Sequence, residues 1–305
     1  MPTVRETDDR RAVLFGLATV LTWSTVATAF KLGLRHMDHV QLLLVANLVS
    51  VLALGLVMLV QGSWRSLPAA PRRQVLLAMG LGLLNPFAYY LILLKAYDLL
   101  PAQVAQPLNY TWALTLAWLS VPLLGQKLRL RDAVAGVVCY SGVVVIATRG
   151  DLASFRVDSP LGVVLALVST VIWALYWIGN RRSGLEPVAG LFLGFLTALP
   201  CTFAVTLAFS SLAIAPAGWL AGAYVGCFEM GFTFVLWLTA MKLTSSTARV
   251  ANLIFLSPFL SLVFIRFVLG EAIAPATPVG LVLIVGGLWW QGRKQPKQRP
   301  AAARP

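Results

Sequence analysis

The chain has 305 residues, of which 59% are hydrophobic and only 11% are charged. Ordinary water-soluble domains carry roughly 25% charged residues, so this composition excludes a soluble domain as the main body of the chain. The formal net charge of +13 would suggest a nucleic-acid partner in a soluble protein. Here the basic residues lie mostly between long apolar runs, where they set membrane topology, so we expect no nucleic-acid partner.

Ten apolar runs, most of them about 20 residues long, follow one another along the chain. In a bilayer every backbone N–H and C=O needs an internal partner, and runs of this length satisfy that need as helices. The sequence therefore predicts an all-α membrane protein with ten transmembrane helices. The expected spans are residues 12–32, 39–61, 74–97, 101–123, 131–148, 160–180, 187–210, 216–241, 246–268 and 276–292.

The basic residues also predict the orientation in the membrane. The first run, from Ala12, is too long for a signal peptide and nine more runs follow it, so we expect an uncleaved span. With the N-terminus inside, eighteen of the 24 lysines and arginines fall on the cytoplasmic side and six on the other. The positive-inside rule then predicts a multi-pass protein of the bacterial inner membrane with both termini in the cytoplasm.

Residues of the kind that bind metals or perform catalysis form no familiar pattern. His36 and His39 lie together in a connection without a metal-ligand spacing, so we expect no metal. The chain has no His-Glu-x-x-His, Gly-x-Ser-x-Gly or Walker motif. We therefore expect neither an enzyme nor a cofactor.

The two halves share landmarks at separations of 144 to 150 residues, which indicates an internal repeat with halves 1–150 and 151–305. A unit of five spans enters the membrane from opposite sides in its two copies. The sequence thus predicts two inverted five-helix repeats around a central cavity, an arrangement typical of carriers that work by alternating access. The paired landmarks are Trp23 with Trp173, residues 94–97 with 238–241, residues 123–128 with 268–273, and Gly136 and Gly142 with Gly280 and Gly286.

These landmarks resemble the drug/metabolite transporter superfamily, in particular its EamA-type ten-helix carriers, over essentially the whole chain. Residues 22–25 (TWST), 109–112 (NYTW), 125–127 (GQK) and 172–176 (IWALY) resemble, more narrowly, aromatic amino acid exporters of the YddG type. The family's Gly-Glu pair is kept at Gly270 and Glu271, whereas Gln126 follows Gly125 in the first half. The resemblance implies a secondary transporter that exports aromatic and other neutral amino acids and related small metabolites. The alternative is a broad drug, metabolite or organic-cation exporter, proton-coupled through Glu229.

Glu229 is the only carboxylate well inside an apolar run. An ionisable group within a membrane is costly unless it faces an interior or a cavity, so we expect a functional role. Its neutral form could carry a proton, and its ionised form could hold a substrate ammonium. The alternative is a buried structural carboxyl bonded to a neighbouring helix.

Asn85 is the repeat mate of Glu229, 144 residues earlier, and Pro86 beside it removes a helical hydrogen bond. We expect a kink, with Pro86 as a hinge or as a packing accommodation. In an ideal helix Tyr89 shares a face with Asn85, whereas Tyr90 lies about 100° further round. The side of the helix that each residue occupies therefore favours Tyr89 over Tyr90 as a cavity residue.

Further polar and aromatic residues complete the expected site. Amide and hydroxyl groups recur at helical spacing in the fourth span, and they either line the cavity or hold helices together. Deep aromatic rings could hold an aromatic ring or organic cation between them, or simply pack the core. The polar candidates are Gln103, Gln106, Asn109, Tyr110 and Asn252; the aromatic ones are Trp23, Trp112, Trp173, Tyr176, Trp177 and Trp237.

The expected partners are thus a small-molecule substrate and the lipid bilayer. The sequence leaves the oligomeric state open, and a monomer is compatible with it.

Overall fold

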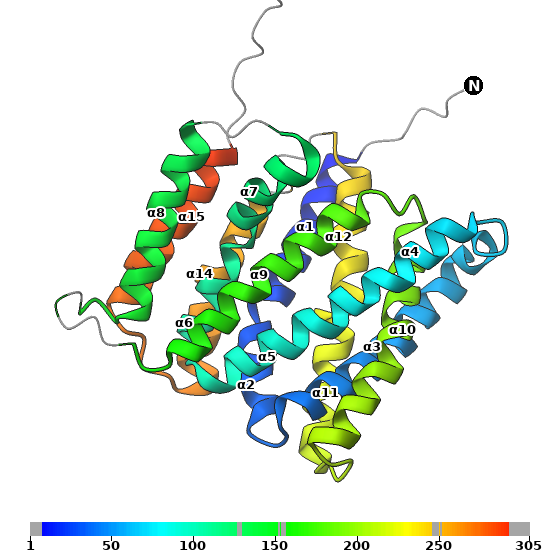
Figure 1. Ribbon diagram of the computed structural model, residues 1–305, viewed down its shortest axis with the longest axis horizontal. Helices are drawn as coiled ribbons and strands as arrows, with labels where there is room; N and C mark the ends of the chain where they lie inside the picture. The colour runs from blue at the N-terminus through cyan, green and yellow to red at the C-terminus, as the bar shows by residue number, and fades with distance from the viewer. Residues whose placement is uncertain are drawn as a thin grey trace, which may run out of the picture.

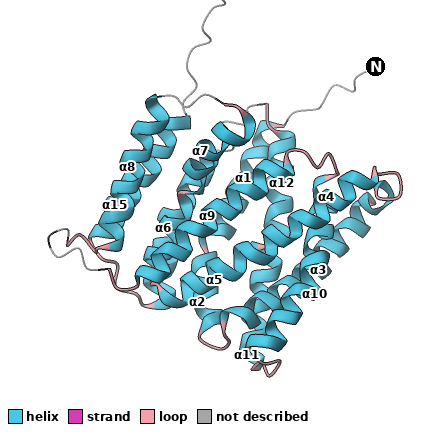
Figure 2. Cartoon of the chain, viewed as in Figure 1, coloured by secondary structure: helices cyan, strands magenta, loops and turns pink. Residues whose placement is uncertain are grey.

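The computed structural model describes residues 8–126, 130–151, 153, 157–245, 250 and 252–292, which form helices and no strands (Figures 1 and 2). Three of the expected spans lie in shorter apolar segments: 102–124, which is broken at Thr111, Ile254–Leu269 and Ala276–Gly292. The prediction of an all-α membrane protein is confirmed. Seven further segments are long and apolar enough to cross a membrane: Asp9–Leu34, His39–Gln61, Arg72–Leu99, Leu130–Ala147, Pro160–Asn180, Pro187–Phe209 and Pro216–Leu243.

The first half begins with a span that is split at Thr25. Asp38 begins the second span with a capping box, because its carboxylate accepts backbone N–H bonds while Gln41 accepts the N–H of Asp38. The elements of this half are α1 (Asp9–Ser24), α2 (Val26–Leu34), α3 (His39–Gln61), η1 (Ser63–Ser66), α4 (Arg72–Gly82), η2 (Leu83–Ala88), α5 (Tyr89–Leu99), α6 (Ala102–Tyr110), α7 (Trp112–Leu124) and α8 (Leu130–Ala147).

In the second half three helices begin with a proline, at Pro160, Pro187 and Pro216. Proline suits the first helical position because its missing N–H would have no partner there anyway. The elements are α9 (Pro160–Asn180), α10 (Pro187–Phe209), α11 (Pro216–Tyr224), η3 (Val225–Glu229), α12 (Phe232–Leu243), η4 (Ile254–Leu256), α14 (Ser257–Phe264), η5 (Ile265–Leu269) and α15 (Ala276–Gly292).

Helices of the two halves pack in matched pairs. α3 lies against its mate α10, and α8 lies against its mate α15. The contact of α1 with α12 is repeated, with the halves exchanged, by the contact of α9 with α5. α1 begins at the end of the molecule where α9 ends (Figure 1). This is the pattern that two oppositely inserted copies of one five-helix unit produce.

The third span of each half is interrupted at the same place in the repeat. α4 and α5 are joined by the π-helical turn η2, and α11 passes into the π-helical turn η3. In η2 the backbone of Asn85 is extended, with φ −139° and ψ 118°. Gly82 lies just before η2 and packs directly on the backbone of Gly194, and its mate Gly226 lies within η3 and packs on the backbone of Ala46. Small residues permit such close helix approach.

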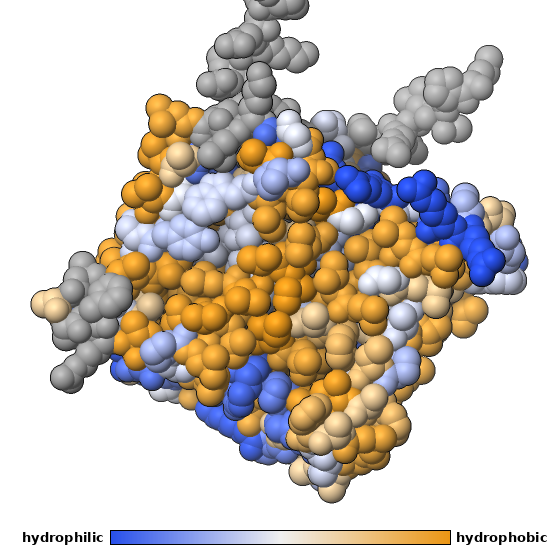
Figure 3. All heavy atoms as spheres, in the orientation of Figure 1, coloured by the Kyte–Doolittle hydropathy of each residue, from blue (hydrophilic) through white to orange (hydrophobic). Residues whose placement is uncertain are grey.

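The outer surface is apolar across the middle of the molecule. In Figure 3 hydrophobic residues form a broad band, while hydrophilic residues gather along its upper and lower margins. Large side chains such as Val60, Phe209 and Phe267 are at least 80% exposed. A surface of this kind is suited to lipid chains rather than to water.

Candidate functional site: a central cavity with one carboxylate

A cavity of about 110 Å³ lies between the two halves, large enough for several water molecules. Its walls come from both repeats: from α1, α2, α5, α6 and α7 of the first half, and from α9, η3, α12 and η4 of the second. The residues that line it are Trp23, Val26, Phe30, Tyr89, Leu93, Tyr97, Gln106, Asn109, Tyr110, Trp112, Trp173, Glu229, Phe234 and Ile254.

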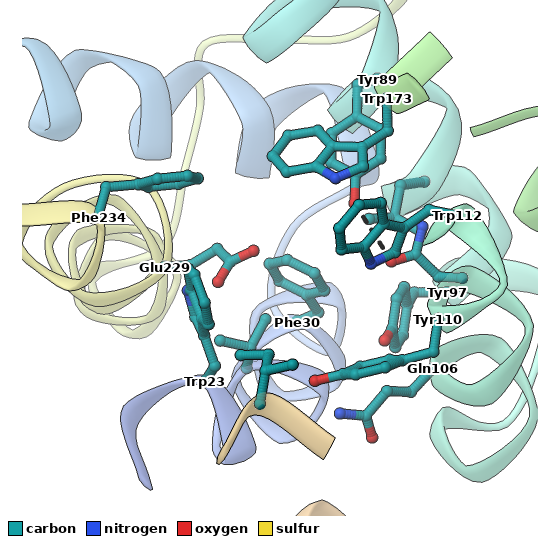
Figure 4. Close-up of a pocket in the computed structure, with 14 residues that line it drawn as sticks. Trp23, Phe30, Tyr89, Tyr97, Gln106, Tyr110, Trp112, Trp173, Glu229 and Phe234 are labelled. Atoms are coloured by element: carbon teal, nitrogen blue, oxygen red, sulfur yellow. Dashed lines mark hydrogen bonds between the residues drawn. The ribbon is translucent and has the colours of Figure 1, made fainter. Parts of the chain in front are cut away.

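Among the described residues that line the cavity, Glu229 is the only carboxylate and none is a lysine or arginine. Its Oε1 accepts a hydrogen bond from the hydroxyl of Tyr90 at 3.0 Å. Its Oε2 is buried and has no hydrogen-bond partner among the described residues. In Figure 4 the carboxylate points away from its own helix toward the centre of the cavity. Oε2 of Glu229 can thus accept a hydrogen bond from a ligand.

The opposite wall, formed by α5 and α6, presents hydroxyl and amide groups (Figure 4). The hydroxyl of Tyr89 donates to Oδ1 of Asn109 at 3.2 Å, and Nδ2 of Asn109 donates to Ser169 at 3.0 Å. Gln106 keeps a buried oxygen without a partner among the described residues. Asn109 is therefore held in place by its neighbours, while Gln106 retains hydrogen-bonding capacity.

Aromatic rings surround these polar groups. Trp173 lies 4.6 Å from Tyr89, between ring centroids, and 6.4 Å from Trp112. On the other side of the cavity Trp23 meets Phe234 edge to face at 5.7 Å. Aromatic faces attract both other rings and cations, so the walls and Glu229 favour the same kind of ligand.

Eight of the fourteen candidate residues line the cavity, namely Trp23, Tyr89, Gln106, Asn109, Tyr110, Trp112, Trp173 and Glu229. Three others stand behind the lining. Tyr176 and Trp177 contact Trp173 at 5.6 and 5.9 Å, and Trp237 contacts Trp23 at 5.9 Å. Their rings support cavity residues without facing the cavity.

The expectation that Asn85 and Asn252 line the central cavity is wrong. Asn85 is buried in a separate small cavity with Tyr176, because the extended backbone of η2 turns it away from the face that Tyr89 occupies. Asn252, which precedes η4, is exposed. Pro86 lies in the η2 break, where a kink is expected, and its role as a hinge stays a prediction.

The structure also resolves the role of Gln103. Its amide nitrogen donates to the carbonyl of Ala272 at 2.9 Å, and its oxygen accepts from Ala274 at 2.8 Å and from Thr277 at 3.0 Å. Glu271 adds a cap, since its carboxylate accepts from the first backbone amide of α6, that of Ala102, at 3.1 Å. Gln103 therefore holds helices together rather than lining the cavity.

Several contributing residues were not expected. Tyr90, the direct partner of Glu229, is only 1% exposed and lies on the face that an ideal helix would turn away. Phe30, Tyr97 and Phe234 line the cavity but carry no sequence signal that separates them from core aromatics. Trp112 also lines the cavity, so of the two positions expected for its ring, the cavity wall and the packed core, the structure shows the cavity wall.

The arrangement is suited to binding a small molecule. The lining has no nucleophile beside a general base, and the described residues contain no group of three or more His, Cys, Asp or Glu that could hold a metal ion. A carboxylate among aromatic rings can hold a cationic group and an apolar body at the same time.

The EamA-like transporter family matches residues 10–148 and again residues 160–291. The chain belongs to this family. It is a multi-pass membrane transporter, and its partners are accordingly a small-molecule substrate and membrane lipid. The two matches fall one on each side of the connection between α8 and α9.

Individual relatives extend this finding. The chain is 26% identical over 279 residues to a protein of Ancylobacter novellus named aromatic amino acid exporter YddG, covering 90% of this chain and 95% of that one. It is 25% identical over 224 residues to the uncharacterized transporter YvbV of Bacillus subtilis, covering 72% of each. A solved structure, titled only as the crystal structure of a protein, shares the fold with a TM-score of 0.65 at 23% identity, covering 92% of this chain and 96% of that one.

Proposed function

We propose that this transporter exports aromatic and other neutral amino acids, and that Glu229 holds the substrate ammonium in the central cavity. The observation that carries the proposal is the buried, unpartnered Oε2 of Glu229, which faces aromatic walls. The name of the Ancylobacter novellus relative, which aligns over nearly the whole chain, supports the same substrate class.

Each part of an aromatic amino acid has a counterpart in the cavity. The ammonium donates to Glu229, in a charge-assisted hydrogen bond of the stronger kind. The ring lies among Trp23, Trp112 and Trp173, whose faces suit offset or edge contacts. The carboxylate accepts from the side-chain donors of the polar wall, such as the amide of Gln106 and the hydroxyl of Tyr110.

Alternating access follows from the way in which the two halves pack. Because the contact of α1 with α12 has its counterpart in that of α9 with α5, the two halves can exchange their packing arrangements and open the cavity first to one side and then to the other. In the orientation set by the basic residues, the termini face the cytoplasm of a bacterial inner membrane and net flux is outward.

Substrate counterflow in proteoliposomes tests the proposal. The variant Glu229→Gln keeps an oxygen that can accept from Tyr90 but loses the charge. Hydrogen bonds to charged groups contribute about 1.5–3 kcal/mol, so we expect counterflow of tryptophan, phenylalanine and tyrosine to fall roughly tenfold or more. Glu186→Gln is the matched control, because that carboxylate caps α10 outside the cavity.

If the wild-type protein gives counterflow of no aromatic or small neutral amino acid, the proposed substrate class is refuted. Equal flux in Glu229→Gln and wild-type protein would remove Glu229 from the mechanism. A pH gradient across the vesicles tests proton coupling through the same carboxylate, since a flux that depends on the gradient should lose that dependence in Glu229→Gln.

A specific observation favours a second candidate, an organic-cation exporter. Among the described residues that line the cavity, one is a carboxylate and none is basic, so this lining complements an amine better than a zwitterion. Tryptamine, which is tryptophan without its carboxylate, separates the two candidates. Counterflow of tryptamine without counterflow of tryptophan would favour the cation exporter.

A further inference from the structure

A second cavity, of about 310 Å³, lies between α7 and α9 toward the end of the molecule where α9 terminates. We refer to it as the α7/α9 groove. Its lining consists of Ala113, Leu116, Ala117, Ser120, Leu124, Gln126, Trp177, Ile178 and Arg181. It is separate from the central cavity, with which it shares no lining residue.

The chemistry of the α7/α9 groove is the reverse of that of the central cavity. Arg181 contributes a guanidinium, and none of the described residues that line the groove is an aspartate or glutamate. Neither Arg181 nor Gln126 has a side-chain hydrogen bond or ion pair among the described residues. Trp177 contributes an indole N–H that is buried and has no acceptor there either. Arg181 and Gln126 are exposed, so their donors are accessible to a ligand, while the Trp177 N–H is buried. Such donors beside apolar residues favour an anionic group attached to an apolar body.

The groove and the central cavity lie back to back. Trp112 lines the cavity and the next residue, Ala113, lines the groove. One turn of α9 separates Trp173, in the cavity, from Trp177, in the groove, and their rings meet edge to face at 5.9 Å. Trp173 and Trp177 therefore separate the α7/α9 groove, which contains the Arg181 guanidinium, from the central cavity, which contains the Glu229 carboxylate.

We propose that the α7/α9 groove is an accessory site that binds the carboxylate of an aromatic amino acid through Arg181, before the ammonium reaches Glu229. This inference rests on the proposed function. It accounts for how a central cavity whose described lining contains no basic residue serves a zwitterion: the carboxylate is recognised first at Arg181, in the groove, and the ammonium then at Glu229, in the central cavity. Trp177 and the apolar floor receive the ring.

Direct binding tests the groove without transport. Indole-3-propionate carries the ring and carboxylate of tryptophan but no ammonium, and its affinity can be measured on the purified full chain. An exposed charge pair contributes up to about 1 kcal/mol, so Arg181→Gln should weaken binding roughly fivefold. Arg182→Gln is the matched control, since that neighbour lines a different cavity. Arg181→Lys keeps the charge and should lose less than Arg181→Gln.

Equal affinities in Arg181→Gln and Arg182→Gln would overturn the proposal. The binding assay also separates this inference from the proposed function. Wild-type protein that moves tryptamine but not tryptophan would refute amino acid export. If the same protein also binds indole-3-propionate independently of Arg181, the accessory site is refuted as well.

Transport kinetics give a second readout. Arg181→Gln should raise the KM for tryptophan several-fold and leave the KM for tryptamine unchanged, because tryptamine has no carboxylate. An equal rise for both would indicate a merely structural role and overturn the proposal. A lipid phosphate shares this anion chemistry, so the vesicles are made with and without phosphatidylglycerol. An Arg181→Gln effect that appears only with phosphatidylglycerol would assign the groove to a lipid headgroup instead.

Discussion

Replacing Tyr90 by phenylalanine removes the hydroxyl that donates to Oε1 of Glu229 at 3.0 Å. The ring itself stays packed, 4.7 Å from Tyr89 and 6.3 Å from Phe30 between centroids, so no cavity is created. Because Oε2 of Glu229 already lacks a partner among the described residues, the substitution leaves the whole carboxyl without one. Interhelical hydrogen bonds in membranes average ~0.6 kcal/mol, but an unsatisfied buried group costs about 1–3 kcal/mol. We expect a loss in that higher range.

Reversible unfolding in mixed micelles measures this loss, and counterflow measures its functional effect. Tyr97→Phe is the control, since Tyr97 is equally buried and lines the same cavity but its hydroxyl has no hydrogen bond among the described residues. Tyr90→Phe should unfold at lower denaturant than Tyr97→Phe and should raise the KM for tryptophan, because Glu229 is no longer held in position. Equal stability of the two variants would refute the view that Tyr90 stabilises the carboxyl.

Two further substitutions test the packing of the halves. Gly82→Ala would place its Cβ 2.7 Å from the Cα of Gly194, and we expect a net loss of about 1–2 kcal/mol because overpacking outweighs the helix-propensity gain. Gly80→Ala, with nothing within 4 Å of its added Cβ, should be neutral or stabilising in the same thermal assay. Glu271→Gln should lower the melting temperature through a loss of about 0.5–2 kcal/mol, since it weakens the cap on α6; an unchanged melting temperature would show that the cap contributes nothing.

The spans and their repetition could be predicted because both depend on local properties. Hydropathy over a window of residues determines whether a segment crosses a bilayer. Pro86 predicts a break in the third span, because proline removes a helical hydrogen bond. The matching break at η3 contains no proline, and it depends on Gly226 meeting the backbone of Ala46, a contact between distant residues. The split at Thr111, between α6 and α7, was likewise not expected.

The cavity was less predictable because its lining depends on the phase of each helix. An ideal helix turns 100° per residue, which groups Asn85 with Tyr89 and sets Tyr90 apart. The extended backbone at Asn85 breaks that phase, so Asn85 lies in another cavity and Tyr90 reaches Glu229. Polar residues within unbroken stretches, such as Gln106, Asn109 and Tyr110, lie where their spacing suggested.

The paired breaks in the third spans lie at the same place in the repeat but differ in chemistry: one carries Asn85 in a separate small cavity, the other Glu229 in the central cavity. A carrier with identical halves would have two access states of equal energy, because a twofold rotation about an axis in the membrane plane would convert one into the other. Here the difference between Asn85 and Glu229, and between Gln126 and Glu271, removes that degeneracy. The two ends of the molecule are therefore not chemically equivalent, and opening the cavity to one side need not cost the same free energy as opening it to the other.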